Sequence, residues 1–227
     1  MRFNFNIILI GGGDSCVEIV DYILTDKKFD IKKFHIRIYD DDFKNQKYFK
    51  KLSSKIILKK KDKLGFLKND NAKALITFGK PELRDEYNSI LFKKKIKLFK
   101  LIHSTAYVSK TAKINPGSVI CPMAVVGSFA QIKDNVYINS AALIGHHSII
   151  KKNTTISPNC FFGGNSKIGS NGFVGAGANI YPGVEIKDYC KIAAGSSVTK
   201  NIPKGSLAYG NPAVYFKNKW YKKIQTF

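Results

Sequence analysis

The sequence predicts a small parallel α/β domain followed by a parallel β-helix. Two observations carry this prediction: residues 1–103 alternate strand and helix patterns, and from about residue 104 an aliphatic residue, once replaced by phenylalanine, recurs every six positions. A length of 227 residues and a hydrophobic content of 44% argue against a disordered chain and against a disulfide-stapled miniprotein. We therefore expect domains at residues 1–103 and 104–205, followed by a tail at 206–227.

The first domain is predicted to be a Rossmann-like sheet, because alternating strands and helices imply parallel strands with a ligand site at their carboxyl ends. Its expected elements are strand Phe5–Ile10, helix Cys16–Leu24, strand Phe34–Tyr39, strand Ala74–Phe78, helix Pro81–Phe92 and strand Ile96–Ile102. Gly12 and Gly13 follow the first strand, and Asp40 and Asp41 follow the second. We expect these four residues near the base and ribose of a nucleotide, the alternative being a purely structural turn. A dinucleotide fingerprint is disfavoured, because Cys16 replaces its third glycine.

The β-helix is predicted from sixteen consecutive positions, six residues apart, that hold an aliphatic residue or, once, phenylalanine. They are Val108, Ile114, Ile120, Val126, Ile132, Ile138, Ile144, Ile150, Ile156, Phe162, Ile168, Val174, Ile180, Ile186, Ile192 and Val198. In an α-helix, residues six apart would point in different directions around the axis and would not line one face. In a flat sheet, the side chains of one face recur every two residues, so a period of six is not needed. Period six instead indicates coils with one short strand and one corner in every six residues, with small side chains such as Cys160 and Cys190 at the tight places.

Several motifs together resemble the bacterial hexapeptide-repeat sugar acyltransferases, which include sialic-acid O-acetyltransferases and UDP-amino-sugar N-acetyltransferases. They are the glycine loop, Gly79 and Arg84 around a strand-to-helix turn, Leu101–His103 before the first coil, and Tyr209–Ala213, which is similar to the family's closing Gly-Asn-Pro-Ala signature. The resemblance implies a left-handed β-helix with three walls and 18 residues per coil. It also implies a homotrimer with active sites between subunits, and acetyl-CoA as acyl donor without a metal.

Acyl transfer needs a base for the acceptor's proton and a donor for the developing oxyanion. Residues 137–147 are similar to the family segment with the catalytic histidine, which implies His146 as general base and Asn139 as a residue near the acceptor. The family commonly has Glu or Asp beside the base, whereas this chain has His147. Either His147 orients His146, a carboxylate comes from a neighbouring chain, or the base is weaker. The alternative is that His146 is an exposed corner residue without a role.

A coil of 18 residues puts Gly164 directly above His146. Its N–H is therefore a candidate donor to the acetyl carbonyl, and the alternative is a glycine required only by a left-handed corner. Matching to the family adds Thr155, Ala176 and Ala194 as contacts of coenzyme A.

We expect an acetyl-CoA-dependent N-acetyltransferase of a nucleotide-linked amino sugar in bacterial glycan biosynthesis, because an amine acceptor needs only a modest base. The alternatives are O-acetylation of sialic acid or another free sugar, and a non-catalytic sugar-binding scaffold. The net charge of +22 comes from lysine with only three arginines, which favours a solvated surface over nucleic-acid binding. No apolar run reaches the roughly 18 to 20 residues of a membrane span. The four cysteines lack metal-ligand spacing, so we expect reduced thiols in a cytoplasmic protein.

Overall fold

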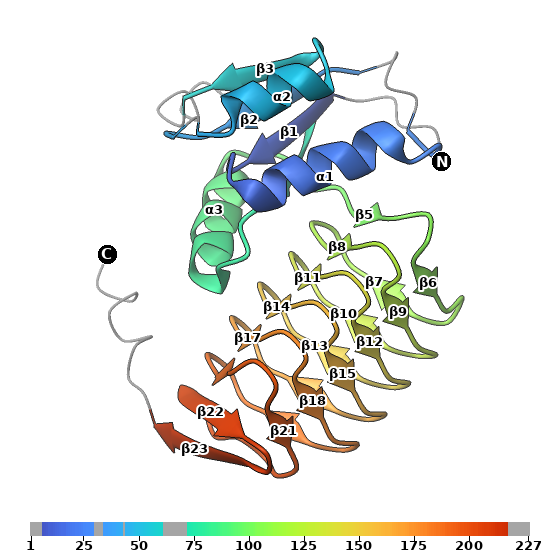
Figure 1. Ribbon diagram of the computed structural model, residues 1–227, viewed down its shortest axis with the longest axis vertical. Coiled ribbons are helices and arrows are strands. Elements are labelled where there is room, and N and C mark those ends of the chain that lie inside the picture. The colour runs from blue at the N-terminus through green and yellow to red at the C-terminus, as the bar shows by residue number, and fades with distance from the viewer. Residues whose placement is uncertain (1–5, 30–33, 43, 61–71, 218–227) are drawn as a thin grey trace. The chain divides into compact units, whose positions relative to one another are not determined.

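The computed structural model describes residues 6–29, 34–42, 44–60 and 72–217. The chain divides into two compact units, one of Met1–Gly79 with Leu83–Phe99 and the other of Lys80–Glu82 with Lys100–Phe227. Figure 1 shows the elements of each unit, coloured along the chain. The predicted fold class, a small parallel α/β sheet followed by a left-handed parallel β-helix, is confirmed.

The first unit contains a parallel sheet with strand order β3-β2-β1-β4. Its elements are β1 (Asn6–Ile10), α1 (Asp14–Thr25), β2 (Ile36–Tyr39), α2 (Gln46–Leu52), β3 (Ile56–Lys59), β4 (Ala72–Ile76) and α3 (Pro81–Lys93). From β1 the chain adds strands on one side and then returns to the other side with β4. Ligands of such sheets bind where the order reverses, which here is the carboxyl end of β1 and β4.

Two expectations for this sheet are corrected. The sequence patterns predict neither α2 nor β3, because both are short. Helix α2 is lysine-rich with Phe49 as its buried side chain, and β3 has no fully buried residue. Ile96–Ile102 is not a single strand of this sheet. Within it Leu98 forms an isolated bridge with Ala74, whereas Leu101–Ile102 is β5, the first strand of the β-helix. Phe5, at the start of the first predicted strand, lies outside the described residues.

The second unit stacks two-residue strands into three walls (Figure 1). Wall 1 contains β5 (Leu101–Ile102), β8 (Val119–Ile120), β11 (Tyr137–Ile138), β14 (Thr155–Ile156), β17 (Phe173–Val174) and β20 (Lys191–Ile192). Wall 2 contains β6 (Tyr107–Val108), β9 (Val125–Val126), β12 (Leu143–Ile144), β15 (Phe161–Phe162), β18 (Asn179–Ile180) and β21 (Ser197–Val198). Wall 3 contains β7 (Lys113–Ile114), β10 (Gln131–Ile132), β13 (Ile149–Ile150), β16 (Lys167–Ile168) and β19 (Glu185–Ile186). We name the corners edge 1–2, edge 2–3 and edge 3–1 after the walls that they join.

The core of this unit is built from the residues that recur every six positions. Each of the sixteen predicted side chains is the second residue of one strand from β6 to β21, and all except Val108 and Ile114 are fully buried. Residues 18 apart pair in parallel, as Leu143 does with Phe161, so one coil is 18 residues long. Burial of one such side chain contributes about 1.5–3 kcal/mol, which explains why the period holds without a slip.

The corners show a second period that the sequence analysis did not use. Every sixth residue from Gly117 to Gly195 has a positive φ, including Asn153, Asn159 and Asn165. Glycine and asparagine tolerate this left-handed conformation, which costs other residues about 1–2 kcal/mol. His147 also occupies such a position, with φ 57°.

The described part of the tail is a hairpin of β22 (Ser206–Gly210) and β23 (Ala213–Lys217). Strand β22 pairs with β20 and so continues wall 1. Residues 218–227 lie outside the described part of the chain. Of the helices that the structure describes, none has the length and apolar character needed to cross a membrane.

Candidate active site

Two histidines stand next to each other on edge 2–3. His146 and His147 follow β12 in the corner that leads to β13, and both side chains are exposed. Their Nδ1 atoms are 3.1 Å apart, and the ring planes are nearly perpendicular at 84°. One ring therefore donates Nδ1–H to the other. When His146 is the donor, its Nε2 keeps a lone pair and can accept a proton.

Gly164 lies over the His146 imidazole, as the 18-residue coil predicts. A Cβ at Gly164 would lie 2.4 Å from Cε1 and Nε2 of His146, so this position has no room for a side chain. The alternative of a glycine required by left-handed geometry is wrong, because Asn165 takes the positive φ at this corner. Among the described residues, the Gly164 N–H donates no hydrogen bond, so it is available to an oxygen next to the imidazole.

His147 is held from two sides. Its ring stacks on Phe129 of the preceding coil, with centroids 5.0 Å apart and an interplanar angle of 25°. Its backbone N–H donates to the Ser128 carbonyl at 2.8 Å. Of the three possibilities for the missing carboxylate, this geometry favours the one in which His147 orients His146.

The remaining predicted residues of the β-helix lie elsewhere. Asn139, Ala176 and Ala194 are on edge 1–2, where the Asn139 Oδ1 accepts the Ser140 N–H at 2.7 Å. Thr155 lies in β14 of wall 1, and its buried hydroxyl has no hydrogen-bond partner among the described residues. Wall 2 separates edge 1–2 from edge 2–3. A single chain therefore does not bring these four residues together with His146.

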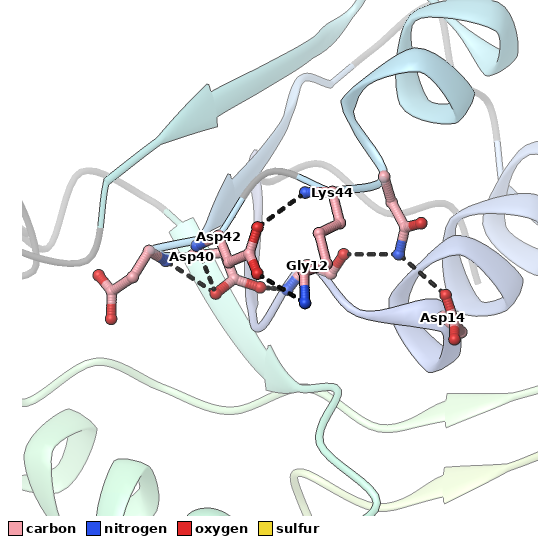
Figure 2. Close-up of polar contacts among 7 residues, drawn as sticks. Gly12, Asp14, Asp40, Asp42 and Lys44 are labelled. Carbon is pink, nitrogen blue, oxygen red and sulfur yellow. Dashed lines mark hydrogen bonds and ion pairs between the residues drawn. The ribbon is translucent and has the colours of Figure 1, made fainter.

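Gly12 and Asp40, two of the four residues predicted to bind a nucleotide, meet at the carboxyl ends of β1 and β2 (Figure 2), and Gly13 and Asp41 follow them in the chain. The Asp40 carboxylate accepts the backbone N–H groups of Gly12 and, at 2.7 Å, of Asp41. Gly12 cannot carry a side chain, because a Cβ would lie 2.8 Å from the Asp40 Oδ2. Asp40 thus fixes the glycine loop. Gly13 has open space around its Cα, with nothing within 4 Å of a Cβ built there.

Sequence patterns missed two residues that shape this loop. Asn45, just before α2, donates from Nδ2 to the Gly12 carbonyl and to Asp14 Oδ1, both at 3.1 Å. Thr77 follows β4 at the reversal of strand order, and its hydroxyl hydrogen-bonds the Gly11 carbonyl at 2.9 Å. Neither belongs to a recognisable motif, because each acts through contacts between segments distant in sequence.

All four cysteines are buried thiols. Burial raises the pKa of the Cys160 thiol to about 11, and it also raises the pKa of Cys16 and Cys190. These thiols stay protonated at neutral pH and are unsuited to nucleophilic catalysis. Within the described ranges, no three His, Cys, Asp or Glu side chains are grouped as metal ligands.

The sequence is similar to known proteins over short stretches. The family model described as "Bacterial transferase hexapeptide (six repeats)" matches residues 165–200. The bifunctional protein GlmU of Clostridium tetani is 43% identical over 49 residues, which is 22% of this chain and only 11% of that relative.

Similar solved structures cover nearly the whole chain. The acetyltransferase domain of PglB from Neisseria gonorrhoeae, in complex with acetyl coenzyme A, has a TM-score of 0.82 and 25% identity, covering 94% of this chain and 100% of that one. Perosamine N-acetyltransferase of Caulobacter crescentus, in complex with CoA and GDP-perosamine, has a TM-score of 0.80 and 20% identity, covering 94% and 97%. WeeI of Acinetobacter baumannii AYE has a TM-score of 0.78 and 20% identity, covering 93% and 100%.

The repeat and the three-walled fold define a hexapeptide-repeat acyltransferase. The α/β unit before the β-helix is part of this similarity, because the solved structures of PglB, perosamine N-acetyltransferase and WeeI match the fold of both units.

Proposed function

We propose that the protein transfers an acetyl group from acetyl-CoA to the amino group of a nucleotide-linked amino sugar, in cytoplasmic steps of bacterial glycan biosynthesis. The observation that carries the proposal is the His146 imidazole, whose Nδ1 is hydrogen-bonded to His147 and whose Nε2 faces Gly164. The similarity to acetyltransferases described with CoA, acetyl-CoA or GDP-perosamine supports the donor and the acceptor class.

In the proposed reaction the acceptor nitrogen bonds to the carbonyl carbon of the thioester, and the carbon–sulfur bond then breaks. His146 Nε2 takes the proton that the neutral amine loses, and the CoA sulfur leaves as a thiolate that receives this proton from the His146 imidazolium. The Gly164 N–H stabilises the oxyanion between these steps, which is worth about 10²–10³-fold in rate for one preorganised donor.

An amine acceptor suits this site better than a hydroxyl. Beside His146 stands a second imidazole, not a carboxylate, so the base gains no full negative charge to increase its basicity. A sugar ammonium loses its proton far more readily than a hydroxyl does, and a modest base is therefore sufficient.

The acetyl-CoA and acceptor contacts are proposed to come from two copies of the chain in a homotrimer. Asn139, Ala176 and Ala194 lie on edge 1–2 and His146 on edge 2–3, so a neighbouring copy has to supply one of the two edges. Wall 2 between them exposes apolar side chains, including Tyr107 at 64%, Phe161 at 41% and Leu143 at 37%. Such a surface suits contact with another copy. Asp40, Asp41, Gly12 and Gly13 are proposed to contact the nucleotide.

The decisive test replaces His146 with alanine and measures CoA release from acetyl-CoA over a panel of UDP-, GDP- and dTDP-linked amino sugars. We expect kcat/KM to fall by about 10²–10⁴-fold, the usual range for loss of a general base. His35→Ala is the control, because this exposed histidine lies outside the β-helix. A His146→Ala enzyme with unchanged activity and oligomeric state would exclude the mechanism.

Assembly of the site from two subunits is tested by mixing inactive chains. His146→Ala and Asn139→Ala chains are co-expressed with different tags and purified as mixed trimers. In each mixed trimer, one of the three sites combines an intact His146 with an intact Asn139 from the neighbour, so about a third of the sites are restored. Activity of mixed trimers no higher than that of the two variants alone would contradict a shared site.

A further inference from the structure

We propose that a pocket on the early-coil side of the histidine pair binds the sugar ring of the acceptor, an inference that rests on the proposed function. The pocket has a volume of about 190 Å³ and is lined by Thr111, Lys113, Phe129, Gln131 and His147. All five residues belong to the β-helix. His147 thus connects the pocket to His146.

Phe129 and His147 form the aromatic side of the pocket. The two rings stack at 5.0 Å, and Phe129 leaves 55% of its surface exposed. Its φ of 59° is the left-handed value shared by every sixth corner residue of the β-helix, so it places the ring at the corner. An exposed aromatic ring that lines a pocket is typical of a binding surface. The C–H face of a pyranose ring provides the flat apolar surface that packs on such a ring.

The polar side of the pocket presents hydrogen-bond donors. Lys113 and Gln131 are the outward residues of β7 and β10 on wall 3. The Gln131 Oε1 accepts a hydrogen bond from Lys133 Nζ at 2.7 Å, which leaves its Nε2 amide hydrogens for a ligand. Ammonium and amide donors favour hydroxyl or carboxylate oxygens and disfavour a sugar ammonium group. The acceptor is therefore bound with its oxygens toward Lys113 and its amine toward the histidines.

The pocket and the proposed thioester position lie on opposite sides of the histidine pair. His146 Nε2 faces Gly164 in the following coil, whereas His147 stacks on Phe129 in the preceding coil. The sugar ring therefore stays clear of the thioester, and its amine has to extend past His147 to meet the thioester carbonyl beside His146 Nε2. In this arrangement Phe129 and Lys113 are specificity-determining residues, and neither takes part in proton transfer.

The test compares Lys113→Ala, Gln131→Ala and the double variant with the wild type. Steady-state kinetics with acetyl-CoA and the panel sugar that the wild type uses best should show the acceptor KM rising about tenfold for each lost hydrogen bond to a charged or amide donor. The acetyl-CoA KM should stay within about twofold, because only the acceptor contacts the pocket. Lys167→Ala is the matched control, since Lys167 is an outward lysine of the same wall but does not line the pocket.

The outcomes separate this inference from the proposed function. If the wild type is active and the variants have the same acceptor KM as the wild type, the pocket assignment is overturned but the proposed function is not affected. A rise in the acetyl-CoA KM alone also overturns the pocket assignment, because the pocket would then belong to the donor. If the wild type acetylates no sugar of the panel, calorimetric titration of the wild type and the variants with GDP-perosamine and with free GDP tests the pocket instead. If the variants bind GDP-perosamine more weakly than the wild type does but bind free GDP equally well, the result supports the pocket even without turnover. If variants and wild type bind GDP-perosamine equally well, the pocket is overturned.

Phe129 gives an independent check. Phe129→Leu keeps an apolar side chain but removes the flat ring, and we expect a higher acceptor KM with an unchanged molecular mass by light scattering. Phe129→Ser should behave in the same way. If Phe129→Ser instead dissociates the oligomer, the ring is buried between copies and the assignment to the sugar is overturned.

Discussion

Replacing Gly164 with alanine tests whether the position of the His146 imidazole limits the rate. The added Cβ would lie 2.4 Å from Cε1 and Nε2 of the ring, whereas ordinary van der Waals contact begins at 3.4 Å. The ring therefore has to move by about 1 Å, and a misplacement of this size can cost on the order of 10²-fold in rate. The fold should tolerate the change, because the clash is with an exposed side chain and Gly164 has no positive φ.

The assay follows CoA release with a thiol reagent. The chain's own cysteines add little background, because they are buried and burial raises the pKa of Cys160 to about 11. Gly79→Ala is the control, since nothing lies within 4 Å of a Cβ at that position. A Gly164→Ala enzyme with kcat near that of the wild type would refute the argument from ring position. If only its acetyl-CoA KM rises, Gly164 acts through donor contact.

Three further changes test the catalytic pair, the corners and the core. His147→Ala should lower kcat by about tenfold with little change in melting temperature, because it removes the ring that is hydrogen-bonded to His146 Nδ1. Met123→Asn should raise the free energy of unfolding in urea by up to about 1 kcal/mol, because Met123 is 69% exposed and has φ 59°. The Cys160 thiol ionises near its reference pKa of 9.0 in the unfolded chain but at about 11 in the folded protein. Stability is therefore retained below pH 9 and falls between pH 9 and 11, and urea unfolding of Cys160→Ala should show a weaker decline.

The β-helix was predictable because a single rule, one buried side chain every six residues, governs all of its coils. In the first unit, β1 and α1 have strong apolar patterns, and the structure places both close to the expected ranges. The segment from Gln46 to Lys59 carries many lysines around few buried residues, so its helix and strand depend on packing that no local pattern reveals. Leu98 and Leu101 belong to different sheets for a similar reason, since the chain passes from one unit to the other between them.

The candidate site was partly predictable by the same arithmetic. Counting 18 residues forward from His146 gives Gly164, and the structure agrees with this stacking. Counting 18 back from His147 would have given Phe129. The stacking of those two rings also depends on the left-handed corner at each position, which the aliphatic pattern does not encode. The loop contacts of Asn45 and Thr77 have no sequence period at all and become visible only in the folded unit.

The chemistry arises where the repeat changes, because a repeated backbone alone gives every coil an equivalent corner. Ser128, His146, Gly164 and Pro182 occupy the same place on edge 2–3 in successive coils, and among these four only His146 places an aromatic ring against a residue without a side chain. Seven residues separate Asn139 from His146, which puts them on neighbouring edges with wall 2 between them. No change of rotamer within one chain can join the two edges across a packed wall. If both residues act in one reaction, a second copy has to bring its own edge to the histidine, and assembly of the oligomer is then a requirement for catalysis.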